Sequence, residues 1–134
     1  MEIQKLITAA VSAQGNSYSP YSNFRVGAAL LTAGGKIYTG SNIENASFSP
    51  TVCAERTAFF KAISEGEKDF TAIVVVGSDN KICMPCGVCR QVMSEFCDAN
   101  FRVICVAKNG EYKEYTLGEL LPFSFKLGEK NENV

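Results

Sequence analysis

The first part of the chain shows one helical pattern followed by two strand patterns. Apolar residues recur at helical spacing near the N-terminus, and Pro20 with its polar neighbours ends the predicted helix. Segments 24–31 and 36–42 are rich in strand formers, and the turn residues 33–35 between them predict a β-hairpin. The apolar positions of the predicted helix are Ile3, Leu6, Ile7, Ala10 and Val11.

Two further helices follow, separated by a buried strand. Residues 49–51 are expected to open the second helix and Gly66 to end it. The β-branched run 73–76 is typical of a strand that is buried on both faces. Pro85 in a first turn predicts the start of the third helix. The apolar stripes of these helices are Ala58, Phe59, Ala62 and Ile63 in the second, and Val88, Val92 and Phe96 in the third.

The remaining patterns complete a mixed fold. Segment 103–107 is predicted to be another buried strand, and 112–116 to return beside it after the turn at Asn109 and Gly110. A short helix is expected at 117–121. Helices between strands imply parallel crossovers, whereas hairpins add antiparallel strands, so we predict an α/β fold. Its form is a three-layer α/β/α arrangement on a mixed five-stranded sheet, with one domain at 1–128 and a polar tail at 129–134.

Composition limits the classes of function. The 134 residues suit one domain, and the 46% of hydrophobic residues with 20% charged ones are ordinary globular values. A net charge of −1 argues against a nucleic-acid partner. No apolar run has the roughly 18 residues of a membrane span, and the first residues lack the layout of a signal peptide. We therefore expect a cytoplasmic protein with no membrane partner.

The chain contains six cysteines and no histidine. The absence of histidine excludes Ser-His-Asp and Cys-His catalysis and every histidine-ligated metal site. Cytosolic thiols stay reduced, so clustered cysteines in that compartment indicate metal binding or redox chemistry. Cys53 lies near the start of the second predicted helix, and Cys86 and Cys89 near the start of the third. Helix N-termini favour thiolates, and three converging thiolates would leave one position of a tetrahedral Zn²⁺ open.

Two other interpretations of the cysteines remain open. Cys83 forms a second C-x-x-C with Cys86, so a closed structural site with four cysteine ligands is possible. Because Cys83 precedes the helix, we expect its side chain to point elsewhere. A thioredoxin-like dithiol would leave the Cys53-Ala54-Glu55 triplet unexplained. Cys97 and Cys105 have the character of buried small hydrophobic residues.

These cysteines belong to motifs that resemble a known family. Cys53-Ala54-Glu55 followed by Pro85-Cys86-Gly87-Val88-Cys89 resembles the signature of zinc nucleoside deaminases, with cysteine in place of the first histidine. The resemblance to the short, homotetrameric cytidine deaminases extends from about residue 5 to 126. Its further motifs are the segment 24–29, the segment 42–46, Cys89-Arg90-Gln91 and Leu120-Leu121-Pro122-x-x-Phe125.

The resemblance implies an enzyme of pyrimidine salvage that hydrolytically deaminates cytidine and deoxycytidine and releases ammonia. It implies Zn²⁺ held by Cys53, Cys86 and Cys89, with an activated water that attacks C4 of the base. Glu55 would take the proton of that water, pass it to ring N3 and then protonate the departing amine. Arg56 would donate hydrogen bonds to ligand sulfurs and so offset the net −1 charge of zinc with three thiolates.

The resemblance also implies the substrate contacts. Phe24 would pack on the pyrimidine, while Asn42 and Glu44 would bind the ribose 3′-hydroxyl, and Ala54 would border the substrate. Phe125 would reach into the site of an adjacent subunit in a homotetramer. Phe48 stands where many family members have tyrosine, so a polar contact from that position is lost.

Two alternatives to a cytidine deaminase remain. A blasticidin-type aminoacylnucleoside deaminase would share the zinc layout, although Phe24 and Asn42-x-Glu44 favour a plain nucleoside. A small, non-catalytic, zinc-stabilised module is the other alternative.

Overall fold

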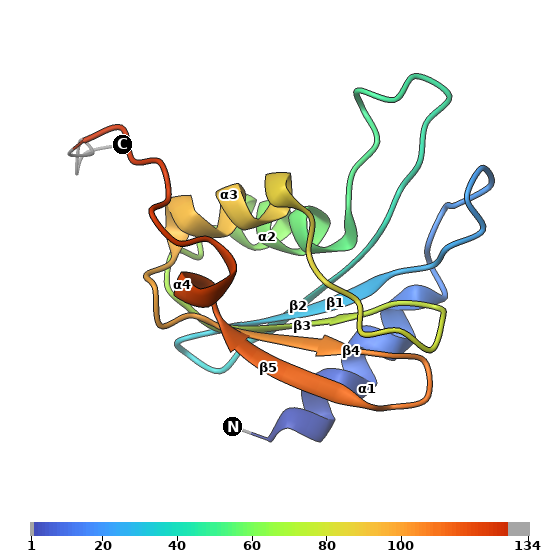
Figure 1. Cartoon of the computed structure of the whole chain (residues 1–134), viewed down its shortest axis with the longest axis horizontal. Coiled ribbons are helices and arrows are strands. Elements are labelled where there is room, and N and C mark those ends of the chain that lie inside the picture. Colours follow the sequence, from blue (N-terminus) through green and yellow to red (C-terminus); the bar gives the residue numbers. More distant parts are fainter. Residues whose placement is uncertain (1, 129–134) are drawn as a thin grey trace.

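The computed structural model describes residues 2–128 and confirms the predicted order of elements (Figure 1). The predicted polar tail at 129–134 lies outside the described residues. The helices and strands are α1 (Ile3–Gln14), β1 (Gly27–Thr32), β2 (Ile37–Ser41), α2 (Ala54–Ser64), β3 (Phe70–Val76), α3 (Gly87–Phe96), β4 (Arg102–Val106), β5 (Tyr112–Thr116) and α4 (Leu117–Leu120).

The strands form the predicted mixed sheet in the order β2-β1-β3-β4-β5. Strands β3 and β4 are parallel, and the other three neighbouring pairs are antiparallel. Both β2 and β3 are antiparallel to β1, so they run in the same direction as each other and as β4. Consequently α2, which follows β2, and α3, which follows β3, begin at the same edge of the sheet.

Helices cover both faces of the sheet, which confirms the three-layer prediction. Helix α1 lies on one face, and α2 and α3 lie on the other (Figure 1). Alternate residues of β3 divide between two cores: Ala72, Val74 and Val76 pack toward α1, whereas Ile73 and Val75 pack toward α2 and α3. A strand that is covered on both sides must be apolar on both sides, as its sequence predicted.

Helix α2 lies very close to the sheet at Gly40 of β2. A Cβ atom at Gly40 would lie 2.4 Å from the Ala54 carbonyl oxygen and 2.6 Å from the Ala58 amide nitrogen. No side chain fits in that space, because real Cβ atoms do not approach backbone atoms so closely. The glycine therefore allows the first turn of α2 to lie directly on β2, and it fixes the height of that turn above the sheet.

Strand β1 begins at Gly27, three residues later than the predicted start at residue 24. The reason is the side chain of Asn42, the residue that directly follows β2. The Asn42 amide donates to the Phe24 carbonyl at 2.8 Å and accepts the Val26 N–H at 2.9 Å. These bonds occupy backbone groups that a strand ladder would use, so residues 24–26 form a separate loop segment.

Helices α2 and α3 both begin later than the sequence predicted. The predicted opening of α2 at residues 49–51 is wrong, because Val52 is still extended and exchanges two backbone hydrogen bonds of 2.9 Å with Ile43. Cys53 is the N-cap of α2. Pro85 does not lie in the first turn of α3, since Cys86 is the N-cap of that helix. Gly66, with a φ of 98°, follows the last residues of α2 as predicted.

One residue in each of two predicted apolar stripes is exposed, so the prediction is wrong at these two positions. Val11 is 48% exposed and Val88 is 58% exposed. Helix α3 instead buries Cys89, Met93 and Ser94. This face is turned toward α2 and the sheet, and it brings a cysteine into the interior.

Candidate active site

Three of the six cysteines meet at the edge of the sheet where α2 and α3 begin. The sulfur atoms of Cys53, Cys86 and Cys89 all lie within 4.8 Å of one another. The Cys53 and Cys86 sulfurs are 3.6 Å apart, and those of Cys86 and Cys89 are 3.3 Å apart. Among the described residues, Cys83 is outside this group. The structure therefore brings together the three predicted ligands and leaves out the fourth candidate.

The donor set fits a zinc ion. Zn–S bonds of about 2.3 Å in a tetrahedron place two sulfurs about 3.8 Å apart, close to the separations found here. The pKa of the Cys53 thiol is lowered to about 5, mainly by its contact with Cys89 and also by Arg56. The pKa of Cys89 is raised by Cys53 and by burial. One thiolate thus opposes the ionisation of the next, and a divalent cation is the partner that makes three thiolates favourable.

Arg56 lies beside the thiols on the first turn of α2. Its Nη2 donates to the Cys53 sulfur at 3.6 Å. Its Nε is buried and has no hydrogen-bond partner among the described residues. The guanidinium therefore puts a fixed positive charge, with donor capacity still unused, next to the sulfur atoms.

Glu55 is buried in the first turn of α2, within interaction range of Cys53 and Cys89, with 4% of its surface exposed. The pKa of its carboxyl is raised to about 7, chiefly by burial and further by the negative charge of Cys53. A helix-capping glutamate would be solvated and would keep an ordinary pKa. The environment of Glu55 is instead that of a carboxyl able to gain and lose a proton near neutrality.

Asn42 and Glu44 lie on the segment that runs beside Val52 and Cys53. Ile43, between them, pairs with Val52 on one side and with Tyr18 on the other. The Asn42 oxygen accepts from Ser17 as well as from Val26, and its nitrogen donates to Phe24. One N–H of this amide remains for another partner.

The ring of Phe24 lies against Gly77, just beyond the end of β3. A Cβ atom at Gly77 would lie 2.7 Å from the Phe24 ring and 3.2 Å from the Cys83 sulfur. Burial raises the pKa of the Cys83 thiol to about 12, so this thiol stays protonated at neutral pH. Cys83 thus packs as a small apolar side chain against Gly77 and the core.

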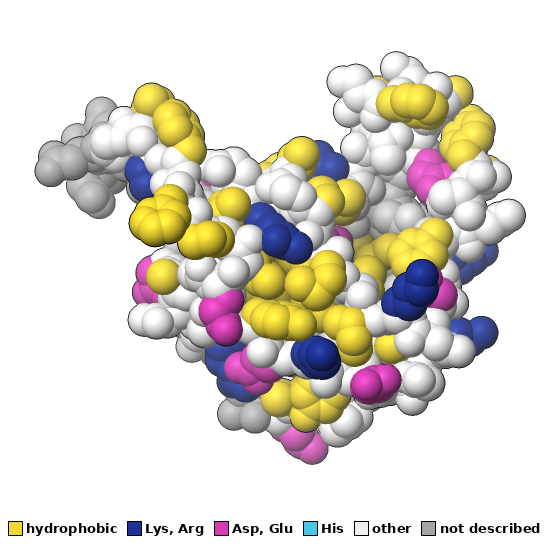
Figure 2. Space-filling model, viewed as in Figure 1, with side chains coloured by type: hydrophobic (Ala, Val, Ile, Leu, Met, Phe, Trp, Pro, Cys, Tyr) yellow, Lys and Arg dark blue, Asp and Glu magenta, His cyan; other side chains and the backbone are white. Residues whose placement is uncertain are grey.

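The remaining predicted site residues separate into buried and exposed ones. Ala54 is fully buried in the first turn of α2. Phe125 is 68% exposed and Phe48 is 86% exposed. Figure 2 shows apolar side chains on the two projecting segments and a hollow surface between them. Within residues 2–128, Phe125 therefore does not join the core of its own chain.

Sequence reasoning assigned no role to the residues that hold this site in place. Arg90 donates from Nε to the Pro85 carbonyl and from Nη1 to the Leu120 carbonyl, both at 2.8 Å, and so ties the start of α3 to α4. Ser17 and Ser22 bind the side chains of Asn42 and Glu44. Their only signal was a polar cluster around Pro20, which indicated the end of a helix and nothing about its partners.

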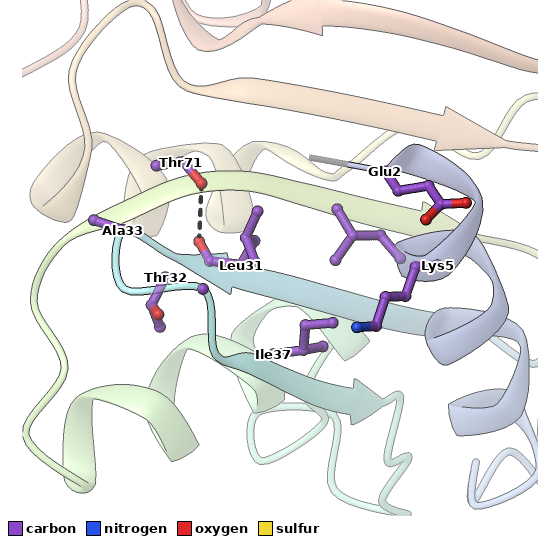
Figure 3. A pocket seen from close by; sticks show the side chains of 9 residues that line it. Glu2, Lys5, Leu31, Thr32, Ala33, Ile37 and Thr71 are labelled. Carbon is purple, nitrogen blue, oxygen red and sulfur yellow. Dashed lines mark hydrogen bonds between the residues drawn. The ribbon is translucent and has the colours of Figure 1, made fainter.

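A separate cavity of about 420 Å³ lies between α1 and the β1–β2 hairpin (Figure 3). Leu6, Leu31 and Ile37 line it together with Glu2 and Lys5. It is located where β1 ends and β3 begins, at the opposite end of the sheet from the thiols. None of the predicted site residues belongs to it.

Comparison with known proteins agrees with this geometry. Residues 1–107 match the family model described as the cytidine and deoxycytidylate deaminase zinc-binding region. A cytidine deaminase from Halalkalibacterium halodurans is 48% identical over 132 residues, which cover 98% of this chain and 100% of that protein. The crystal structure of a cytidine deaminase from Burkholderia pseudomallei is 45% identical with a TM-score of 0.90, covering 93% of this chain and 100% of that one. A blasticidin-S deaminase from Bacillus cereus is more distant, at 36% identity over 75% of this chain and 76% of that protein.

The layered fold and the three-thiol site define a zinc-binding protein of the deaminase class. The chain belongs to the cytidine and deoxycytidylate deaminase family. The family model describes a zinc-binding region, so Zn²⁺ is the cofactor, and the group of Cys53, Cys86 and Cys89 is able to bind it.

Proposed function

We propose that this protein catalyses the hydrolytic deamination of cytidine and deoxycytidine to uridine and deoxyuridine, with release of ammonia. The observation that carries the proposal is the position of the buried Glu55 beside three thiols with metal-site geometry. Cys53, Cys86 and Cys89 would hold Zn²⁺ and leave its fourth position open. When bound, the ion supplies Lewis acidity that lowers the pKa of a water molecule from 15.7 to about 7.

Glu55 serves as the proton carrier of the reaction. Its carboxylate accepts a proton from the attacking water and delivers it to N3 of the pyrimidine. It then accepts a second proton, from the hydroxyl that has been added at C4, and delivers it to the amine, which leaves as ammonia while the C4 carbonyl forms. A carboxyl with a pKa of about 7 accepts and returns a proton at similar cost at neutral pH. Burial keeps bulk water away from these transfers.

The substrate contacts follow from the surroundings of the thiols. Phe24 offers an apolar ring for the pyrimidine at the end of β3. Asn42 has one N–H left to donate and Glu44 is acceptor-only, so the pair suits a sugar hydroxyl, which both accepts and donates. Ala54 offers the backbone of the first turn of α2. The Glu44 carboxylate would repel a phosphate at the same position, which favours a free nucleoside.

An absorbance assay tests the proposed function. Purified protein is mixed separately with cytidine, deoxycytidine, cytosine and blasticidin, and the loss of absorbance near the maximum of each compound is followed. We expect turnover of the first two compounds. Turnover of blasticidin alone would assign the protein to the aminoacylnucleoside deaminases, and no turnover of any compound by zinc-loaded protein would favour a non-catalytic module.

Arg56 should tune the metal site. Replacing Arg56 with alanine removes the positive charge beside Cys53, so activity and zinc affinity should each fall about 10–100-fold, as expected for residues that support metal ligands. Arg56→Gln keeps hydrogen-bond donors, so its activity and zinc affinity should lie between those of the wild type and those of Arg56→Ala. The matched control is Arg102→Ala, which removes a surface pair with Glu114. Unchanged zinc retention against a chelator in Arg56→Ala would show that the arginine does not support the site.

We further propose a homotetramer with active sites shared between subunits. Phe125 and Leu127 are exposed on the C-terminal segment, and exposed apolar clusters of this kind mark subunit contacts. Lys126, between them, donates from Nζ to the Ser94 carbonyl at 2.6 Å and to the Ser94 hydroxyl at 3.1 Å. The segment is therefore anchored on α3 while Phe125 and Leu127 face outward, available to the site of a neighbouring chain.

Mixing subunits tests the shared site. Phe125→Ala should raise KM for cytidine and leave kcat nearly unchanged, because it removes packing on the base and not the chemistry. Glu55→Gln chains still carry Phe125, so mixing them with Phe125→Ala chains should restore low-KM turnover. The control mixes Phe125→Ala chains with chains that carry both substitutions. This mixture contains no Phe125, so it should not restore low-KM turnover. No rescue, or full activity of a monomer in light scattering, would contradict the shared site.

A cytoplasmic location is also proposed. All six cysteines lie among the described residues and none forms a disulfide, as in compartments that keep thiols reduced. Within residues 2–128, the structure contains no helix that is both long and apolar enough to cross a membrane.

A further inference from the structure

The loop before Phe24 is built around the side chain of Glu44. One carboxylate oxygen, Oε1, accepts the Tyr21 N–H at 2.9 Å and the Ser22 N–H at 3.1 Å. The other oxygen, Oε2, accepts the Ser22 hydroxyl. Ser22 therefore binds both oxygens of the same carboxylate, one through its backbone and one through its side chain.

The direction of the Ser22 hydroxyl is determined by Phe24. The Phe24 N–H donates to the Ser22 oxygen at 3.0 Å. A serine hydroxyl has one proton, and an oxygen that already accepts from Phe24 has that proton free for Glu44. The turn that makes both contacts possible passes through Asn23, whose φ of 57° is tolerated by asparagine better than by most residues.

These contacts keep Glu44 ionised and oriented. The pKa of its carboxyl is lowered, chiefly by the Ser22 hydroxyl and further by the backbone N–H groups of Tyr21 and Ser22. A carboxylate offers about four acceptor positions, so the bonds from Tyr21 and Ser22 leave capacity for one more donor. Glu44 is thus held in one orientation on the segment that pairs with Val52, next to Cys53.

We propose that Ser22 is a positioning residue for substrate binding: its hydroxyl holds Glu44 as an oriented acceptor for a hydroxyl of the nucleoside sugar. The inference rests on the proposed function, in which Asn42 and Glu44 bind the ribose 3′-hydroxyl. Ser22 acts through Glu44 and does not itself touch the reacting atoms. Its contribution should therefore appear in binding, and only for substrates that carry the hydroxyl.

The test compares Ser22→Ala with the wild type on cytidine and on 3′-deoxycytidine. With cytidine, we expect KM to rise about tenfold and kcat to change less than about threefold, because a hydrogen bond to a charged group is lost. With 3′-deoxycytidine, the two proteins should have the same KM, since Glu44 has no hydroxyl to bind. Ser22→Thr keeps the hydroxyl and should restore the wild-type KM for cytidine.

Matched variants separate this role from a general effect on folding. Ser12→Ala makes the same change on α1, away from the site, and should leave both substrates unaffected. Glu44→Gln, with Ser22 intact, should reproduce the selective rise in KM for cytidine. An equal rise on both substrates, or no rise with cytidine in either Ser22→Ala or Glu44→Gln, would overturn the inference. A wild-type protein that turns over neither nucleoside would overturn the proposed function as well.

Discussion

Replacing Glu55 with glutamine is expected to abolish nearly all deamination while leaving the zinc in place. Glutamine has almost the same shape but cannot take a proton from water or return one to the leaving amine. Each proton transfer contributes about 10²–10⁴-fold, and Glu55 serves in more than one, so kcat should fall by at least about 10³-fold. Initial rates with cytidine, together with elemental analysis for zinc, provide the measurement.

A matched substitution controls for the loss of a carboxylate. Glu111→Gln makes the same chemical change in the exposed turn between β4 and β5 and should retain full activity. Turnover of Glu55→Gln within tenfold of the wild type would rule out Glu55 as the proton carrier. Loss of zinc from the same variant would instead assign the carboxylate to the metal site.

Removing any one of the three clustered cysteines is expected to remove the zinc and all activity with it. Cys53→Ala, Cys86→Ala and Cys89→Ala each leave two thiolates, which do not complete a site that needs three protein ligands. Elemental analysis should give close to one zinc per wild-type chain and close to none for each variant. Because an ion held by these cysteines would join the starts of α2 and α3, the melting temperature of these variants should fall.

Cys83→Ala distinguishes this site from a closed four-cysteine site. Cys83 lies outside the cluster and against Gly77, so its variant should keep the zinc and most of the activity. If Cys83→Ala lost its zinc while one of the other three variants kept it, the ligand assignment would be wrong. Treatment with a chelator should inactivate the wild type, and added Zn²⁺ should restore it.

The metal centre was the most predictable part of the site. Cys53 precedes one helical pattern, and Cys86 and Cys89 lie at the start of another. Because helices and strands alternate along the chain, both helices begin at the same edge of the sheet. Glu55 was predicted from its place in the motif. Its burial and its raised pKa were not, because they depend on α2 lying close to β2 at Gly40.

The surroundings of the substrate contacts could not be derived from local patterns. Residues 24–26 have a strand-like composition, yet the Asn42 side chain takes their backbone hydrogen bonds and separates them from β1. Ser22 and Glu44 are 22 positions apart in the chain. A hydrogen bond between such positions has no periodicity that a sequence can display.

The sequence by itself determined the types and order of the elements, the mixed sheet and the identity of the clustered thiols. These depend on local periodicity, on turn residues and on the requirement that doubly covered strands be apolar. Only the tertiary structure decided where β1, α2 and α3 begin, and that α3 buries Cys89 and Met93 and exposes Val88. The physical reason is that contacts with distant segments decide where an element begins and how a helix is rotated about its axis. Examples are the pairing of Val52 with Ile43, the hydrogen bonds of Asn42 to Phe24, and the hydrogen bond of Arg90 to Leu120.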